Sequence, residues 1–200
     1  MRVNPEKKEE KERITQALLR ATLRLAATHG FVSLGLREVS RAADIAPTSF
    51  YRHFADMEAL GLALIEDEAG RLLAESVTRA EQSAARGRVD AIALELLASA
   101  AADPELMRFI LAERVGAIPA FRAALGARLS TLRTAVQRAL DAEHGTGRVP
   151  SHAADAAVVL MLEASSLVLE HGLEHDSLRD ELLSQIRALV SGALAAEGAR

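Results

Sequence analysis

The most constraining feature of the sequence is a pair of very short helical segments joined by three residues. Residues 36–43 read LREVSRAA, residues 47–53 read PTSFYRH, and residues 44–46 lie between them. Helices shorter than about 12 residues are marginal in water, so packing against other helices must hold both segments. Pro47 suits the first position of a helix, where its missing N–H is not needed. The sequence therefore predicts a helix-turn-helix that is held against a longer helix.

The rest of the chain also follows a helical pattern. Apolar residues recur with a period near 3.6, and Ala and Leu greatly outnumber the β-branched residues, which is typical of helical proteins. Gly and Pro interrupt this pattern at intervals, and Asp or Ser stands before several of the segments as an N-cap residue. We therefore predict an all-α fold with helices over about 5–29, 36–43, 47–53, 57–84 (capped by Asp56), from Pro104 (capped by Asp103), beyond the break at 116–119, over 151–171 (capped by Ser151) and over 176–195 (capped by Asp176).

The second short segment has two chemically different faces. Phe50 and Phe54 lie four residues apart, so we expect both to point inward and to form a small core with Phe31. The opposite side carries groups that suit the major groove of DNA. These groups are the guanidinium of Arg52 for guanine, the hydroxyls of Thr48 and Ser49 for base edges, and Tyr51 and His53 for phosphates.

The charge of the chain is unevenly distributed. Residues 1–56 hold ten Lys or Arg against seven Asp or Glu, whereas the remainder holds fourteen against twenty-one. Lys7, Lys8 and Lys11 could form a basic arm that reaches a polyanion. They also alternate with Glu residues at helical spacing and could be the solvated start of a helix. Both interpretations remain open at the level of the sequence.

Residues 31–60, FVSLGLREVSRAADIAPTSFYRHFADMEAL, resemble the N-terminal helix-turn-helix of the TetR family of bacterial transcriptional regulators. The resemblance implies an all-helical homodimer with a three-helix DNA-binding head over residues 1–56. Residues 57–200 would form a body that binds a small molecule and dimerises. Carried over position by position, it implies a DNA-facing set of Arg37, Pro47, Thr48, Ser49, Tyr51, Arg52 and His53.

Two positions depart from the pattern of this family. Asp44 stands in the turn where the family usually has Gly, and Asp tolerates a left-handed backbone better than most residues. Gly35 stands where Ser or Thr usually caps the first short helix, so we expect a slightly weaker cap. Neither departure removes a group that would contact DNA.

A second block of resemblance lies in the body. ERVGAIPAFRAAL, residues 113–125, together with the helix-turn-helix, is similar to the FabR and DesT group of TetR-type regulators of unsaturated fatty acid synthesis. This similarity implies a long-chain acyl-CoA or acyl carrier protein thioester as effector. The apolar members of the implied pocket could also be ordinary core, its arginines could be surface residues, and a TetR-type regulator of efflux with an unrelated ligand is the alternative. The implied pocket residues are Leu106, Phe109, Ile110, Arg114, Phe121 and Arg122.

A single helix-turn-helix reads too short a site for specific control, so we expect a homodimer on a palindromic double-stranded operator. The last two helices offer small residues that let backbones approach and an apolar stripe. The predicted interface residues are Ala157, Ala164, Leu178, Leu182, Ile186, Leu189 and Val190.

Enzymatic chemistry finds little support in the sequence. The stretch HGLEH, residues 171–175, fits the spacing of inverted zinc peptidases, in which two His hold zinc beside a Glu base. Gly172 interrupts the helix that this chemistry requires, so we expect no peptidase activity, no catalytic metal and no cofactor, and a linker with adventitious metal affinity is the more favoured interpretation. A helical adaptor without specific DNA affinity is a further alternative.

The sequence also bears on where the chain works. It has no Cys, its first residues are charged where a signal peptide would be apolar, and its apolar runs look too short to span a bilayer. A cytoplasmic protein without a membrane segment is therefore expected.

Overall fold

A computed structural model describes residues 5–83, 88–172 and 176–198 of the chain, and this described part is helical with no β-strand. The observed helices confirm the predicted all-α fold. Their bounds are α1 Pro5–His29, η1 Phe31–Ser33, α2 Leu36–Ala42, α3 Pro47–Phe50, α4 Met57–Ala63, η2 Leu64–Ala69, α5 Gly70–Gln82, α6 Arg88–Ala102, α7 Pro104–Glu113, α8 Pro119–His144, α9 Ser151–His171 and α10 Asp176–Gly198.

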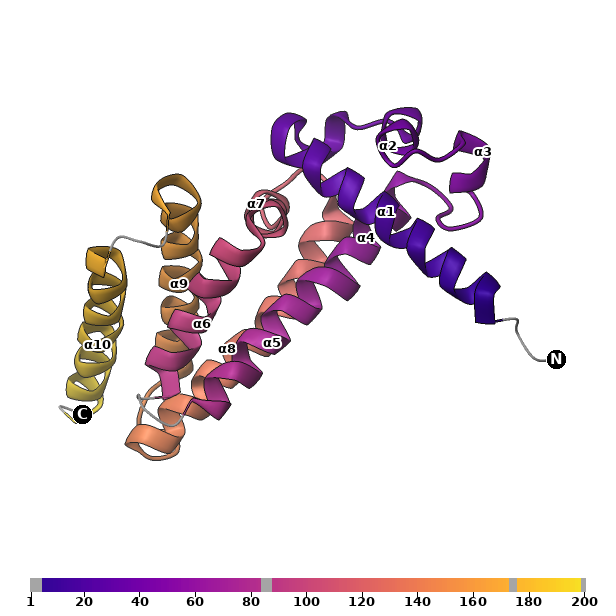
Figure 1. The fold of residues 1–200 in the computed structure, drawn as a ribbon. Helices are drawn as coiled ribbons and strands as arrows, with labels where there is room; N and C mark the ends of the chain where they lie inside the picture. The colour runs from indigo at the N-terminus through magenta and orange to yellow at the C-terminus, as the bar shows by residue number, and fades with distance from the viewer. Residues whose placement is uncertain (1–4, 84–87, 173–175, 199–200) are drawn as a thin grey trace.

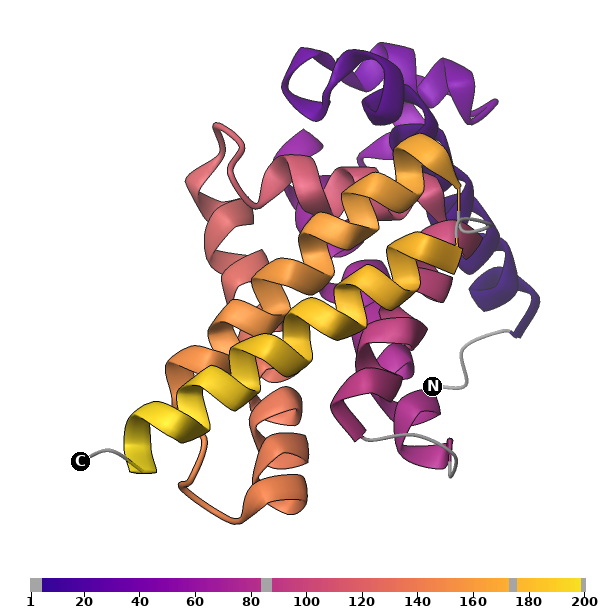
Figure 2. The ribbon, with the colours of Figure 1, turned by 90° about the vertical axis from the view of Figure 1, so that its left-hand side faces the viewer.

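The helices form a head and a body (Figure 1). In the head, α1 packs against α2, and α2 packs against α3. In the body, α5, α6, α8 and α9 pack together, and α10 lies along α9 on the side away from α3 (Figures 1 and 2). Helix α1 also packs against α7, so the head and the body are in direct contact.

The turn between α2 and α3 forms as its sequence predicts. Asp44 has φ 56°, and in the described part of the chain it is the one non-glycine residue with a positive φ. The N–H of Ile45 then returns to the carbonyl of Ser40 at 2.9 Å, which closes the turn. Gly35 precedes α2 without a side-chain cap, as expected.

The predicted helix over residues 57–84 is a continuous rod with a wide turn in its middle. It begins at the predicted cap, since the Asp56 carboxylate accepts a hydrogen bond from the N–H of Ala59 at 2.8 Å. Between α4 and α5, however, η2 is π-helical rather than α-helical. Such turns are rare and occur often at functional sites. Glu66 in this turn pairs with Arg128 of α8, which joins η2 to α8.

The aromatic core of the head differs from the prediction. Phe50 is fully buried and its ring lies 5.9 Å from that of Phe54, as expected. The ring of Phe31 instead contacts the body, at 4.9 Å from Phe121 and 5.9 Å from Phe109. Phe31 lies beyond α1, where the chain turns toward α7 and α8, so the body offers it aromatic partners. Three rings from distant parts of the sequence thus join head and body.

Of the two predicted helix caps at Asp103 and Ser151, the structure has the first and not the second. Asp103 caps α7 as predicted, accepting from the N–H of Leu106 at 3.1 Å. Ser151 does not cap α9, because the helix already includes Ser151 and its preceding residue, Pro150, makes no side-chain cap. The Asp176 side chain lies outside the described part.

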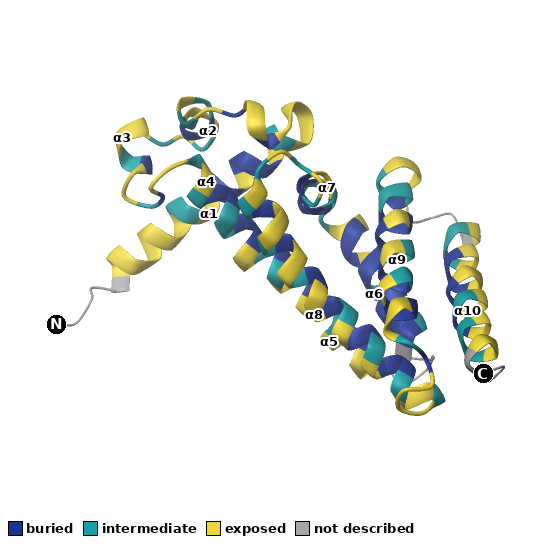
Figure 3. Cartoon of the chain, turned by 180° about the vertical axis from the view of Figure 1, so that it is seen from behind, coloured by how far each residue is buried: buried dark blue, intermediate teal, exposed yellow. Residues whose placement is uncertain are grey.

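Contrary to the expectation from its apolar runs, α9 is long and apolar enough to cross a membrane by length and composition alone. Half of that apolar window is buried inside the structure, against α6, α8 and α10. The core helix of a soluble protein meets the same criteria. Figure 3 shows the alternation of buried and exposed residues along α9 that packing on one side produces.

Candidate nucleic-acid interface

The outer face of α3 and of the turn that follows it presents polar side chains to solvent. Thr48, Tyr51 and Arg52 are exposed, Tyr51 to 65%, whereas Phe50 on the opposite side is fully buried. After Phe50 the chain continues as a hydrogen-bonded turn, with the His53 N–H donating to the Phe50 carbonyl at 2.8 Å. The apolar face therefore fixes the orientation of the polar face, as recognition of a DNA groove requires.

The other members of the predicted DNA-facing set surround this face. Pro47 at the start of α3 and Arg37 on α2 are exposed, and Ser49 is half-buried. Arg37 also lines a shallow hollow at the turn between the two helices. The same hollow includes Arg41, which is not a member of the predicted DNA-facing set. The helical spacing of the sequence could have indicated Arg41, because Arg41 lies four residues after Arg37 and therefore one turn further along the same face of α2.

His53 is held by α1. Its Nδ1 atom lies 3.0 Å from the hydroxyl of Thr15, and the same hydroxyl donates to the carbonyl of Lys11 at 2.9 Å. A hydroxyl has one proton, so when Thr15 donates to Lys11, Nδ1 must carry the hydrogen that Thr15 accepts. The neutral ring then has no proton on Nε2, and only the imidazolium can donate from that atom to a phosphate.

The surroundings of His53 also disfavour its charged form. Partial burial lowers the pKa of His53, and the neighbouring cations Lys11 and Arg52 lower this pKa further. A phosphate would supply the opposite charge and favour the imidazolium. A phosphate bound at this histidine would therefore be coupled to uptake of a proton.

The residues predicted for the effector are not gathered around one cavity. Leu106, Ile110 and Phe121 are each at most 1% exposed and pack within the core, and Phe109 is 3% exposed. Arg122 is exposed and donates to the carbonyl of Gly116 at 2.6 Å. The half-buried Arg114 lies at the end of α7. Among these residues, Phe109 lines the hollow described next, and Leu106 lines a separate one beside α5.

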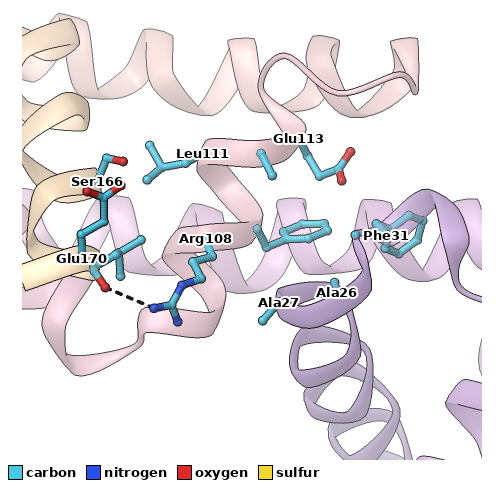
Figure 4. A pocket seen from close by; sticks show the side chains of 12 residues that line it. Ala26, Ala27, Phe31, Arg108, Leu111, Glu113, Ser166 and Glu170 are labelled. Atoms are coloured by element: carbon cyan, nitrogen blue, oxygen red, sulfur yellow. Dashed lines mark hydrogen bonds between the residues drawn. The ribbon is translucent and has the colours of Figure 1, made fainter.

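A hollow of about 500 Å³ lies between the end of α1, α7 and α9 (Figure 4). Its walls are mostly apolar, with Phe31 and Phe109 among them, and Arg108, Glu113 and Glu170 are its charged residues. Arg108 donates to the carbonyl of Leu169 at 3.2 Å and thereby bridges α7 and α9. The size is within the range of small-molecule sites, which is about 300–1,000 Å³.

The predicted dimer stripe is largely used inside the subunit. The stripe on α10 packs against α9 and α6 of the same chain. Leu178 and Leu189 are half-buried. The side chains that are at most 6% exposed in the single chain, and so cannot serve a second subunit, are Ala157, Ala164, Leu182, Ile186 and Val190. The outer side of α9 offers different apolar side chains around the exposed Glu163, with Val159 54% exposed and Ala156, Leu160 and Leu167 half-buried.

The HGLEH stretch is only partly described. His171 ends α9 and is exposed, whereas Glu174 and His175 lie outside the described residues. Within the described ranges, no three His, Asp or Glu side chains are grouped as a metal site would need.

The fold and the two-faced α3 define the class of the protein: an all-helical protein with an N-terminal helix-turn-helix. Residues 18–64 match the family model of bacterial regulatory proteins of the tetR family. The match covers the segment that contains α2 and α3 and shows that this segment is similar to the helix-turn-helix of that family.

Solved structures of TetR-like regulators share the whole fold. The fatty acid degradation regulator FadR from Bacillus halodurans aligns with a TM-score of 0.74 and 14% identity over 96% of this chain and 98% of its own. A TetR family transcription regulator from Marinobacter aquaeolei VT8 aligns with a TM-score of 0.74 and 20% identity over 92% and 98%. FadR from Bacillus subtilis in complex with stearoyl-CoA aligns with a TM-score of 0.73 and 15% identity over 88% and 98%. At these identities the likeness concerns the fold.

Proposed function

We propose that the protein is a sequence-specific transcriptional repressor. The observation that carries the proposal is the orientation of α3, whose apolar side is locked by Phe50 and Phe54 while Thr48, Tyr51 and Arg52 face outward. Arg37, Pro47, Ser49 and His53 complete the proposed DNA-binding set. A helical adaptor would have no need of this separation of faces.

Gel shifts with the DNA that flanks its own gene test the proposal. We expect specific retention of that DNA over random DNA of equal length at physiological salt. Arg52→Ala should weaken specific binding by about 1–3 kcal/mol and relax one base position, because a bidentate Arg–guanine pair contributes about this much discrimination.

Arg138→Ala is the matched control, because Arg138 is exposed on α8, in the body. It should leave the retention of the specific DNA unchanged. Equal losses of specific and random binding on Arg52→Ala would assign Arg52 to a phosphate rather than to a base.

We propose that the repressor acts as a homodimer through α9 and α10. The exposed Val159 and the half-buried apolar residues around it support a surface that a second copy covers. The two α3 helices would then lie about 34–36 Å apart, or a multiple of this, to enter successive major grooves of a palindromic operator. Helix α9 is continuous from Ser151 to His171, so the simplest symmetric arrangement pairs α9 with α9 of the second copy.

We propose further that a hydrophobic small molecule, an acyl-CoA or acyl carrier protein thioester, controls operator affinity in the cytoplasm. The resemblance of residues 113–125 to regulators of fatty acid synthesis and the fold shared with FadR in complex with stearoyl-CoA support this effector. A regulator of efflux with an unrelated ligand is the second candidate. Titration of palmitoyl-CoA into the complex with operator DNA separates the two, since only the first predicts a change in DNA retention at micromolar concentrations.

A further inference from the structure

The first two turns of α1 have no packing inside the subunit that explains them. Residues 6–13 are all exposed, and Leu18 is the first buried residue of α1 in the described part of the chain. This segment extends from the head on the side of α3 and away from α10 (Figures 1 and 3). A helix that is polar all round needs ion pairs along its surface or a partner to be stable.

The ion pairs of this segment do not include its lysines. Glu10 lies three residues after Lys7, but it pairs with Arg13 instead, at 2.7 Å. In the described part of the chain, Lys7, Lys8 and Lys11 make no ion pair. Lys7 and Lys11 also lie four residues apart, where like charges destabilise a helix. A stabilising role at the solvated start of a helix therefore does not account for these lysines.

The three lysines lie on one side of α1, which we call the lysine face. Because an α-helix has 3.6 residues per turn, Lys7, Lys8 and Lys11 fall within a sector of about 100° around the helix axis. Thr15 falls in the same sector, and its hydroxyl lies 3.0 Å from Nδ1 of His53. After burial, the charge of Lys11 is the largest cause that lowers the pKa of His53, so Lys11 lies near that ring. The lysine face is therefore continuous with the proposed DNA-binding set.

The lysine face also accounts for the positive charge of the head. Residues 1–56 hold ten Lys or Arg against seven Asp or Glu, an excess equal to the three lysines, whereas the remainder holds fourteen against twenty-one. The acidic body repels a polyanion, so the attraction for DNA has to come from the head. Without the lysine face, the head would carry no net charge to attract DNA.

We infer that the lysine face binds the phosphate backbone of DNA beside the bases that α3 contacts. The inference rests on the proposed repressor function and adds to it a DNA-binding surface outside the helix-turn-helix. A Lys ammonium is a compact charge with three donors on a flexible stem, which suits a phosphate better than a base edge. Contacts of this kind strengthen the binding of all sequences alike and fix how α3 is placed on the duplex.

The salt dependence of DNA binding tests the lysine face. Gln has nearly the helix propensity of Lys, so substituting Gln removes the charge and keeps α1 helical. The measured quantity is the slope of the logarithm of the association constant against that of the salt concentration, obtained by fluorescence anisotropy of labelled DNA. Lys11→Gln should reduce its steepness by about 0.9 for each bound subunit, and replacement of all three lysines by Gln should reduce it by about 2.7.

The control removes the same charge from another surface. Arg138→Gln changes an exposed residue of α8, in the body, and should leave the slope unchanged. The reduction in the lysine variants should be the same on specific and on random DNA, because phosphates do not depend on sequence. A reduction of less than about 0.9 for each subunit in the triple variant would overturn the assignment.

A footprint gives a direct second readout, because Lys7, Lys8 and Lys11 are the only lysines of the chain. Lysine acetylation by sulfo-N-hydroxysuccinimide acetate, followed by mass spectrometry of peptides, therefore reports on this face alone. Bound DNA should slow the acetylation of all three lysines severalfold, and salt that dissociates the complex should restore it. Equal acetylation with and without bound DNA would refute contact with the backbone.

The repressor function and the lysine face can fail separately. If the flanking DNA were retained no better than random DNA while both slowed acetylation, the lysine face would stand and the repressor proposal would fall. Specific retention of the flanking DNA with unprotected lysines would refute the lysine face alone.

Discussion

At the scale of single residues, we predict that His53 makes DNA binding sensitive to pH. Burial and the cations Lys11 and Arg52 lower its pKa in the free protein, whereas a phosphate at Nε2 would raise it. Binding then takes up a proton, so operator affinity should rise as the pH falls through the pKa of the bound state and level off below the pKa of the free state. We expect an increase of about threefold between pH 7.5 and 6.5, below the tenfold limit for one proton, measured by fluorescence anisotropy of labelled operator.

Two variants separate this histidine from other sources of pH dependence. His53→Gln keeps hydrogen-bonding groups but does not titrate, so its affinity should be flat over the same range. Thr15→Val removes the hydroxyl that holds the proton on Nδ1. It frees the neutral ring to donate from Nε2, and it should also reduce the slope. A slope unchanged in His53→Gln would locate the titrating group elsewhere.

At the scale of helices, the contact between α4 and the aromatic cluster depends on the absence of a side chain. A Cβ at Gly61 would overlap the rings of Phe121 and Phe31, both of which are buried and enclosed. Gly61→Ala gains up to about 1 kcal/mol of helix propensity. Overpacking costs about 1–3 kcal/mol, so we expect net destabilisation, seen as a lower urea midpoint by circular dichroism.

Gly126→Ala provides the matched control for this prediction. Gly126 lies inside α8, is exposed, and a Cβ there would meet no other atom within 4 Å. It should raise the midpoint, since only the gain in propensity of about 0.5–1 kcal/mol applies. Stabilisation by both substitutions would show that the aromatic cluster yields easily at α4.

Local features of the helices could be predicted from the sequence, whereas the partners of each helix could not. The Asp56 and Asp103 caps and the left-handed Asp44 depend on a few neighbouring residues, so the sequence predicted them correctly. The partners of Phe31 come from α7 and α8, far along the chain, and helical spacing contains no information about them. Spacing likewise identified the apolar stripe of α10 but not its partner, which proved to be the same subunit.

Within the candidate sites, the exposure of Thr48, Tyr51 and Arg52 opposite the buried Phe50 could be predicted, because the helical period alone separates the two faces. The hollow between α1, α7 and α9 was harder to predict from the sequence. Phe109 belongs to the observed hollow, but Ala26 and Ala27 come from the head and appear in the sequence as ordinary residues of α1. Such a site arises only when α1, α7 and α9 meet in the folded chain.

At the scale of the whole molecule, specific DNA binding and dimerisation should fail together. Val159 is 54% exposed on the side of α9 that the subunit leaves uncovered. Val159→Asp would bury a charge in the proposed interface and should weaken the dimer by about 2 kcal/mol or more, roughly 30-fold in the dissociation constant measured by sedimentation equilibrium. Retention of a palindromic operator should fall with it, whereas the weak binding of a single half-site should not.

Val115→Asp places the same charge at a still more exposed valine, in the turn after α7. It should alter neither the dimer nor the operator complex, because that turn lies outside α9 and α10. If Val159→Asp left the dimer intact, the subunits would have to pair through another surface. The separation of the two α3 helices, and with it the spacing of the operator half-sites, would then be set by different elements.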